Sequence, residues 1–350
     1  MVGRLVTLAV SGVLVVVMVA AGWYLPVPYV REAPGPTYNT IGDVDGRPVV
    51  SVTGRKTYSV SGHLNMTTVS VIGGPGNQPS LGQVLTGWVD PNVAVVPEEI
   101  YYPEGTTRQQ IEKESAEQFQ SSEDEGTVAA LRHVGIPVKE RLIVKTVQKD
   151  MPAEDELHAG DQIWAINGVR TPNAASVQKQ MGKYEPGDRV RITVKRKGEQ
   201  STVALKTVPA PDNEERAIVG IELGADYTYP VKVRIRLQNV GGPSAGLMFS
   251  LAIVDLLTER QLADGRFIAG TGTMDSQGKV DAIGGVTQKM VAAKDEGATV
   301  FLTPSGNCAE ARRTAPDGMR LVKVGTLEDA VDALDTIRTG DGAVPSCDGS

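Results

Sequence analysis

The stretch GGPSAGLMFSLAIVDLL, Gly241 to Leu257, places a glycine-rich turn directly before a strongly apolar run. The pattern predicts a turn followed by a buried helix, with Ser244 at the junction. A helix start offers free N–H groups and a positive dipole end, which can stabilise a developing oxyanion. The backbone amides of Ser244 and Ala245 are therefore the expected oxyanion donors. The alternative is that Ser244 is simply a helix N-cap, which is common for serine in this position.

Ser244 also completes the pattern G-x-S-x-G, the nucleophile elbow of α/β-hydrolases, in which the partner histidine follows the serine. All three histidines of this chain, His63, His133 and His158, precede Ser244. Other serine proteases do place histidine first, but two of these histidines fall in a segment with its own fold pattern and the third in a predicted strand. A histidine base is therefore not favoured.

A lysine is the remaining common base for a serine. Residues 283–298, IGGVTQKMVAAKDEGA, have a helical pattern in which Val286, Met290 and Ala293 form an apolar stripe with Lys289 at its edge. Burial lowers the pKa of lysine from about 10.4 towards the value of about 7 to 8 that a general base needs. The competing interpretation is that Lys289 lays its stem over the core and keeps its amine in water.

A second pattern occupies residues 141–171, RLIVKTVQKDMPAEDELHAGDQIWAINGVRT, where two β runs are separated by turn residues. The order resembles a PDZ domain of the bacterial protease-associated type over about residues 122–210. In PDZ domains an extended peptide adds to a strand edge beside a helix. The resemblance implies a peptide groove formed by Leu142, Ile143, Val144, Val177 and Met181.

The Ser244 turn and the Lys289 helix together resemble the proteolytic domain of Lon-type serine proteases, the S16 peptidases. That family carries a Ser-Lys dyad in a G-P-S-A-G turn and a G-G-x-x-x-K helix, and the resemblance spans Asp212 to Ile337. It implies that Ser244 is the nucleophile and Lys289 the general base, 45 residues apart. It also points to Asp275 as a supporting residue, near the place where the family has a threonine.

Two positions depart from the Lon pattern: Gly241 stands where aspartate is usual, and Gln288 where glutamate is common. These departures keep open a non-catalytic alternative, a membrane-tethered PDZ adaptor with an inactive Lon-like domain. An esterase that uses the same dyad is a third alternative. Because both dyad residues are present, a serine endopeptidase is the favoured interpretation.

The segment Leu5 to Leu25 is uncharged, and at about 1.5 Å per residue it is long enough to cross a hydrocarbon core of roughly 30 Å. Arg4 precedes it, and Trp23 and Tyr24 close it, which predicts an inside N-terminus. A signal peptide cleaved before Gly22 is the alternative. We favour the uncleaved anchor, and hence a single-pass cell-membrane protein with most of its chain on the extracytoplasmic side.

Composition narrows the partners and cofactors. The chain has 35 Lys plus Arg against 42 Asp plus Glu, a net charge of -7, so no nucleic-acid partner is expected. Cys308 and Cys347 are the only cysteines, and in an oxidising compartment a disulfide is favoured over a metal site or two free thiols. No G-x-x-x-x-G-K-[ST] loop occurs, so ATP-independence is expected, with no metal or cofactor.

One membrane anchor, a PDZ domain and a Lon-type domain together resemble the YlbL-type Lon-like proteases of Gram-positive bacteria. The expected fold class is α/β (α+β) and multi-domain, with protein or peptide substrates as partners and, by resemblance to ring-forming Lon domains, a homo-oligomer. The predicted division is a transmembrane anchor (1–26), an N-terminal region (27–121), a PDZ domain (122–210), a proteolytic domain (211–338) and a tail (339–350).

Within the N-terminal region, the Pro/Gly-rich residues 29–42 are expected to form a stalk. Strands follow up to about Val96, and a capping-box pattern predicts a helix over Arg108 to Phe119.

Overall fold

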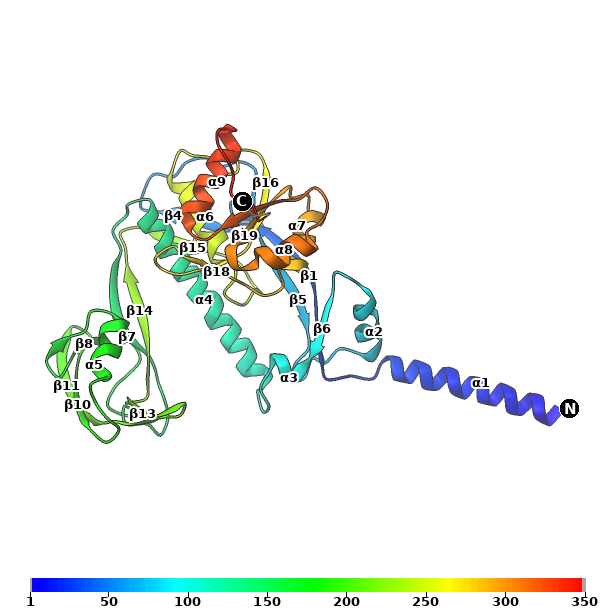
Figure 1. Cartoon of the computed structure of the whole chain (residues 1–350), viewed down its shortest axis with the longest axis horizontal. Helices are drawn as coiled ribbons and strands as arrows, with labels where there is room; N and C mark the ends of the chain where they lie inside the picture. The colour runs from blue at the N-terminus through cyan, green and yellow to red at the C-terminus, as the bar shows by residue number, and fades with distance from the viewer. Residues whose placement is uncertain (1, 348–350) are drawn as a thin grey trace. The chain divides into compact units, whose positions relative to one another are not determined.

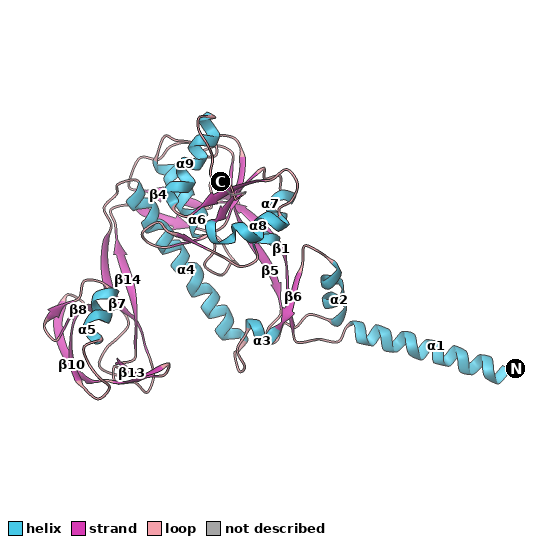
Figure 2. Ribbon diagram, viewed as in Figure 1, coloured by secondary structure: helices cyan, strands magenta, loops and turns pink. Residues whose placement is uncertain are grey.

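A computed structural model describes residues 2–347 of the chain (Figure 1). The described residues form two compact units: Pro137–Pro230 is one, and the residues before and after it in sequence form the other. The protein is a mixed helix and strand structure, as the sequence predicted (Figure 2).

The first unit is built on a six-stranded mixed sheet with the order β20-β19-β16-β5-β1-β6. Its strands are β1 (Tyr29–Asn39), β5 (His63–Ile72), β6 (Ala94–Pro97), β16 (Phe267–Gly270), β19 (Val300–Pro304) and β20 (Arg320–Val324). The strands β5, β16, β19 and β20 run parallel, whereas β1 is antiparallel to both of its neighbours. Three two-stranded pairs accompany this sheet: β2 (Asp43–Val44) with β3 (Arg47–Pro48), β4 (Val50–Thr53) with β15 (Lys232–Ile235), and β17 (Thr273–Met274) with β18 (Val280–Asp281).

The expected stalk over residues 29–42 is wrong, because most of it forms β1, which lies inside the sheet between β5 and β6. The register with β5 shifts between Pro34 and Thr37, where the prolines have no N–H to donate to a ladder. Gly35 is needed at this irregularity, since a Cβ there would collide with Thr68. The proline and glycine content that indicated a stalk therefore marks a bulge inside a strand.

The helices of this unit are α1 (Val2–Trp23), α2 (Leu81–Val89), α3 (Glu98–Tyr101), α4 (Arg108–His133), α6 (Gly246–Leu257), α7 (Val286–Asp295), the 3₁₀ turn η1 (Ser305–Asn307), α8 (Cys308–Thr314) and α9 (Leu327–Thr339). The apolar α6 is the central core helix: every residue except Leu256 is buried. It contacts α4, α9, β4 and β5, so its apolar character serves a protein interior.

Helix α4 begins at the predicted residue, where Thr107 and Gln110 form a capping box. It continues to His133, well beyond the predicted end at Phe119. Its second half is buried, with Gly126 accepting a 2.8 Å hydrogen bond from the side chain of Ser250 on α6. Tertiary packing thus extends a helix through a charged segment that local signals predicted to be a boundary.

The second unit is a sheet with the order β11-β10-β8-β7-β14, and β9 pairs with β8. Its elements are β7 (Lys139–Val147), β8 (Gln162–Ile166), β9 (Val169–Arg170), α5 (Ala174–Met181), β10 (Arg189–Arg196), β11 (Glu199–Lys206), β12 (Val208–Ala210), β13 (Asn213–Ile218) and β14 (Ile221–Thr228). The strand β14 pairs with β7 along its whole length. The expected division at residues 210 and 211 therefore falls inside this unit, and the one at residue 122 falls inside α4.

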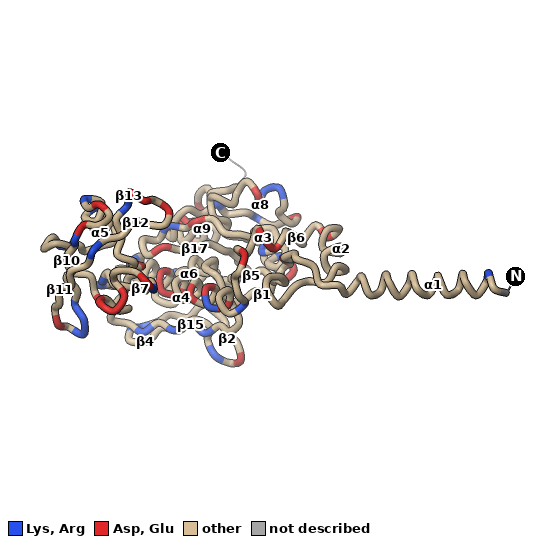
Figure 3. Tube along the Cα trace, turned by 90° about the horizontal axis from the view of Figure 1, so that it is seen from below, with Lys and Arg blue, Asp and Glu red and all other residues tan. Residues whose placement is uncertain are grey.

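Residues Gly3–Trp23 of α1 form a helix that is long and apolar enough to cross a membrane. Its apolar side chains are exposed, and Lys or Arg occurs only at its N-terminal end (Figure 3). A signal sequence would have the same properties.

Cys308 and Cys347 form a disulfide, which joins α8 to the C-terminal segment after α9. Both cysteines lie in or against an apolar cluster that also contains Phe301, on β19, and Met290, on α7.

Candidate active site

Ser244 lies in the turn that precedes α6. The N-cap of α6 is Ala245, which makes no side-chain cap, so Ser244 lies one residue before the cap and its hydroxyl is not used for capping. Gly242 has a φ of 84°, a left-handed conformation that favours glycine. Gly246 has no room for a Cβ, since Met274 and Ser122 lie against it. These two glycines hold the serine at a sharp, closely packed turn.

Helix α4 supports this turn from behind. The Gly242 amide donates to the Ser115 carbonyl at 3.0 Å, and the Ser122 hydroxyl donates to the Pro243 carbonyl at 2.9 Å. A side chain at Gly241 would collide with the hydroxyl of Ser115. The glycine that departs from the Lon pattern therefore packs directly against α4, and a larger residue there would have to displace the Ser115 hydroxyl.

Lys289 lies on α7 with its side chain directed at this turn. Its Nζ is 2.8 Å from Ser244 Oγ and 3.2 Å from Thr271 Oγ1. The lysine is only 4% exposed, and Val286, Met290 and Ala293 of its stripe are fully buried. Gly285, the N-cap of α7, has a φ of 67°, and a Cβ there would collide with Val69 of β5, so this glycine allows the start of α7 to pack closely against the sheet.

Thr271 forms hydrogen bonds with both Ser244 and Lys289. This residue was not identified from the sequence. Its hydroxyl accepts from Lys289 and donates to the Ser244 carbonyl at 3.1 Å, and its side chain is fully buried. Asp275, the expected supporting residue, instead accepts from the backbone amides of Gln277 and Lys279 and closes the turn between β17 and β18. The stretch GTGTMD contains both residues, so the sequence indicated the right segment, but the supporting role was assigned to Asp275 instead of Thr271.

The surroundings of Lys289 shift its protonation equilibrium towards the neutral amine. Burial lowers its pKa to about 8, while the Glu32 carboxylate acts in the opposite direction. The change from the ordinary value of 10.5 corresponds to roughly 3 kcal/mol in favour of the neutral amine. Glu32, on β1, is half-buried, and burial raises the pKa of its carboxyl group. Tyr101 donates a hydrogen bond to Glu32.

The backbone near the serine has free donors. Among the hydrogen bonds of residues 2–347, none is donated by the amide of Ser244 or Ala245, the expected oxyanion donors. The carbonyl of Ser244 accepts from the Gly272 amide at 2.9 Å, and the Leu247 amide donates to the Gly272 carbonyl at 3.2 Å. The segment after β16 therefore fixes the turn and leaves these two amides available.

The predicted PDZ groove needs correction. Ile143 of β7 is paired with Gly224 of β14 on one side and with Gln162 of β8 on the other, so β7 lies inside the sheet, although its ladder with β8 consists of this one residue pair. Most of the predicted groove residues belong to the core: Leu142, Val144 and Val177 are buried in it, and Met181 packs against it. Ile143 is half-buried. Within the described residues the edges of this sheet are β11 and β14. The sequence interpretation missed this because it assigned residues 221–228 to the proteolytic domain.

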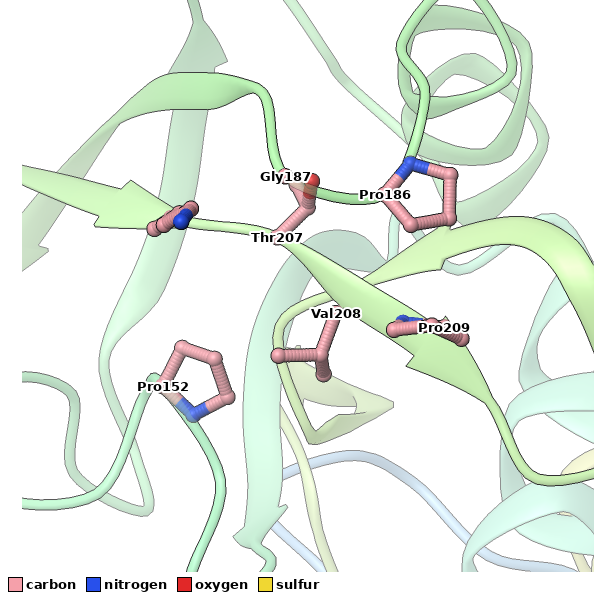
Figure 4. A pocket seen from close by; sticks show the side chains of 7 residues that line it. Pro152, Pro186, Gly187, Thr207, Val208 and Pro209 are labelled. Atoms are coloured by element: carbon pink, nitrogen blue, oxygen red, sulfur yellow. The ribbon is translucent and has the colours of Figure 1, made fainter.

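A surface pocket in the same unit is lined by Pro152, Pro186, Gly187, Lys206, Thr207, Val208 and Pro209 (Figure 4). None of the predicted groove residues belongs to it. Across residues 2–347 no group of three or more His, Cys, Asp or Glu side chains could hold a metal ion.

Two family models match the chain. The model described as a PDZ domain matches residues 118–207, and the model described as the Lon protease (S16) C-terminal proteolytic domain matches residues 238–335. The second range contains Ser244, Thr271 and Lys289. The chain therefore carries a PDZ domain and a Lon-type proteolytic domain.

Curated relatives match part of the chain. A Lon protease homologue from Caenorhabditis elegans, named as peroxisomal, is 30% identical over 194 residues, which is 55% of this chain and 24% of that protein. Lon protease 1 from Herpetosiphon aurantiacus is 40% identical over 84 residues, 24% of this chain and 10% of that protein. The chain thus matches at most a quarter of the length of these two relatives. Among solved structures, the PDZ domain of an SdrC-like protein from Listeria monocytogenes is 27% identical, with a TM-score of 0.22, over 24% of this chain and 86% of that one.

Proposed function

We propose that this chain, which carries a PDZ domain and a Lon-type proteolytic domain, is a membrane-anchored serine endopeptidase that works without ATP. The observation that carries the proposal is the 2.8 Å contact between Lys289 Nζ and Ser244 Oγ in a site where the lysine is buried. A buried lysine whose pKa is about 8 is partly neutral at physiological pH and can accept a proton from a serine hydroxyl.

The reaction follows from these positions. Ser244 Oγ attacks the carbonyl carbon of the scissile peptide bond while its proton moves to Lys289 Nζ. The amides of Ser244 and Ala245 hold the negative charge that develops on the carbonyl oxygen. The Lys289 ammonium then gives its proton to the leaving amine as the C–N bond breaks, which leaves an acyl-enzyme on Ser244. A water molecule, deprotonated by Lys289, hydrolyses the ester and restores the serine.

Substrates are proposed to be extended segments of extracytoplasmic proteins, since nothing in the described residues suggests an unfolding motor. The PDZ domain would capture or gate them. Because β7 is paired on both sides, we place the peptide-binding edge on β14, where the half-buried Ile221 and Leu223 pack against the core. The helix α1 would anchor the chain in the membrane.

The test is cleavage of a reduced, alkylated and therefore permanently unfolded protein by the full chain in detergent micelles, with no nucleotide added. We expect cleavage at the same rate with and without ATP and Mg²⁺, together with labelling of the protein by a serine-directed fluorophosphonate. A requirement for ATP would contradict the motor-independent proposal. The absence of both labelling and cleavage would contradict the endopeptidase proposal.

The pH dependence of this reaction should report Lys289. Only its neutral form accepts the serine proton, so kcat/KM is expected to rise with pH around a midpoint near 8. Glu32 stabilises the ammonium form, so Glu32→Gln should lower the pKa of Lys289 and move that midpoint to lower pH. The measurement is a pH–rate profile of peptide hydrolysis between pH 6 and 10, with the exposed Glu259→Gln as control. An unchanged midpoint in Glu32→Gln would show that this carboxylate does not act on the base.

A further inference from the structure

The short helix α2 presents an exposed apolar face. Leu85, Trp88 and Val89 lie at i, i+3 and i+4 and so share one side of the helix. Trp88 is 56% exposed and Val89 is 82% exposed. The nine residues of α2 carry no charge, and between residues 73 and 97 the only charged residue is Asp90. A helix with such a face, outside the core of its own unit, indicates a surface that meets another apolar phase.

This face is tied to the end of α1 by backbone contacts. The Leu81 amide donates to the Leu25 carbonyl at 2.8 Å, and the Val27 amide donates to the Pro79 carbonyl at 3.0 Å. Gly82, in the first turn of α2, packs so closely against the ring of Trp23 that a Cβ there would collide with it. At about 1.5 Å per residue, the far end of α2 is only about 14 Å from these contacts.

We propose that α2 is a membrane-surface element, whose Leu85, Trp88 and Val89 lie in the headgroup and upper acyl region of the bilayer at the end of α1. This inference rests on the proposed membrane anchoring by α1. If α1 spans the bilayer, Trp23 and Tyr24 lie at its interface, and the contacts to Leu25 bring the start of α2 to the same level. Tryptophan combines an apolar ring with one N–H donor, which suits this zone. The lipid surface would remove the apolar face from water and fix the proteolytic domain close to the membrane.

The test uses the three tryptophans of the chain, Trp23, Trp88 and Trp164, in the full-length protein inserted into vesicles. Two of the three are replaced by Phe, so that each variant reports one site, and the lipids carry bromine atoms on their acyl chains. We expect emission from Trp88 to be blue-shifted and to lose most of its intensity, as that of Trp23 does. Trp88 is partly shielded by Tyr29, at 5.7 Å between ring centroids, so its loss can be slightly smaller than that of Trp23.

A matched control comes from the opposite side of the same helix. Gln83 is exposed and lies about 160° around the helix from Leu85, the middle residue of the apolar face. The variant Gln83→Trp, with all three native tryptophans replaced by Phe, keeps the backbone bond to the Ser80 hydroxyl and should be quenched much less than Trp88. The exposed substitution Val89→Asp, made in the variant that retains Trp88, should weaken quenching because it places a charge in the proposed lipid contact.

The outcomes separate the inference from the anchoring on which it rests. Quenching of Trp23 without Trp88 would overturn the inference and leave the anchor in place. Quenching of neither would overturn both. A blue-shifted Trp88 that brominated lipids do not quench would mean that protein, such as a second copy of this chain, covers the face, and would also overturn the inference. Equal quenching at positions 83 and 88 would contradict the one-sided contact.

Discussion

Replacement of Ser244 by alanine is expected to lower peptide hydrolysis by at least about a thousand-fold and to abolish labelling by a fluorophosphonate. The hydroxyl oxygen of Ser244 is the only atom of the site that is proposed to form a covalent bond to the substrate. Alanine removes this oxygen without adding bulk. Because Ser244 caps no helix and its side chain is only half-buried, the variant should fold normally. Residual turnover above that of water would come from the amides of Ser244 and Ala245.

The measurement is a parallel assay of labelling and cleavage by the wild-type protein and the variant. The exposed Ser61→Ala is a matched control, since it removes a serine hydroxyl elsewhere in the same unit. It should label and cleave like the wild type. If Ser244→Ala retained wild-type labelling, another serine would be the nucleophile and the proposed dyad would be wrong.

Replacement of Lys289 by methionine is expected to reduce kcat by about 10² to 10⁴-fold, the range that general-base catalysis supplies. Methionine has a similar length and suits the buried, apolar surroundings of α7, but it cannot accept a proton. The double variant with Ser244→Ala should be no slower than the slower of the single variants, since the two residues act on the same step. The measurement is a set of steady-state rates for the three variants.

Folding provides an independent readout for Lys289. The native site desolvates an amine, and an apolar side chain of similar size does not carry this cost, so the melting temperature of Lys289→Met should equal or exceed that of the wild type. Lys294→Met, on the same helix but less buried, should retain activity. If the methionine variant were active, the lysine would have only a structural role. If Lys289→Met did not fold, its loss of activity would not report on the base, and Lys289→Arg would be compared with the wild type instead. Arginine keeps the charge but cannot act as a base.

Much of the candidate site follows from local sequence. The glycine turn before an apolar helix places Ser244 at a helix start, and the 3.6-residue period of 286–295 turns Lys289 towards the interior. Both signals are read within a few residues, and the resemblance to Lon proteolytic domains, in the order and 45-residue separation of the two motifs, implies that they belong together. The apolar segment of α1 and the capping box at Thr107 are equally local.

The residues that surround the Ser244–Lys289 pair could not be identified from local patterns, because they come from segments that are far apart in the sequence. Glu32 comes near Lys289 only because β1, which looked like a stalk, joins the sheet beside β5. Thr271 was passed over for Asp275 because both fit the same stretch, and the hydrogen bonds to Ser244 and Lys289 distinguish them.

The packing of Gly241 and the edge of the PDZ sheet also depend on contacts between segments that are far apart in the sequence. Gly241 packs against Ser115 of α4, which lies about 130 residues earlier in the chain. The strand β14 pairs with β7 across about 80 residues and so occupies one edge of the strand that was predicted to line the groove. Sequence periodicity reports which face of an element is apolar, whereas the partner of that face is set by the free energy of packing the whole chain. Local sequence therefore indicated the chemistry of the Ser244–Lys289 pair, and only tertiary structure identified the residues that orient it, tune it and present substrate to it.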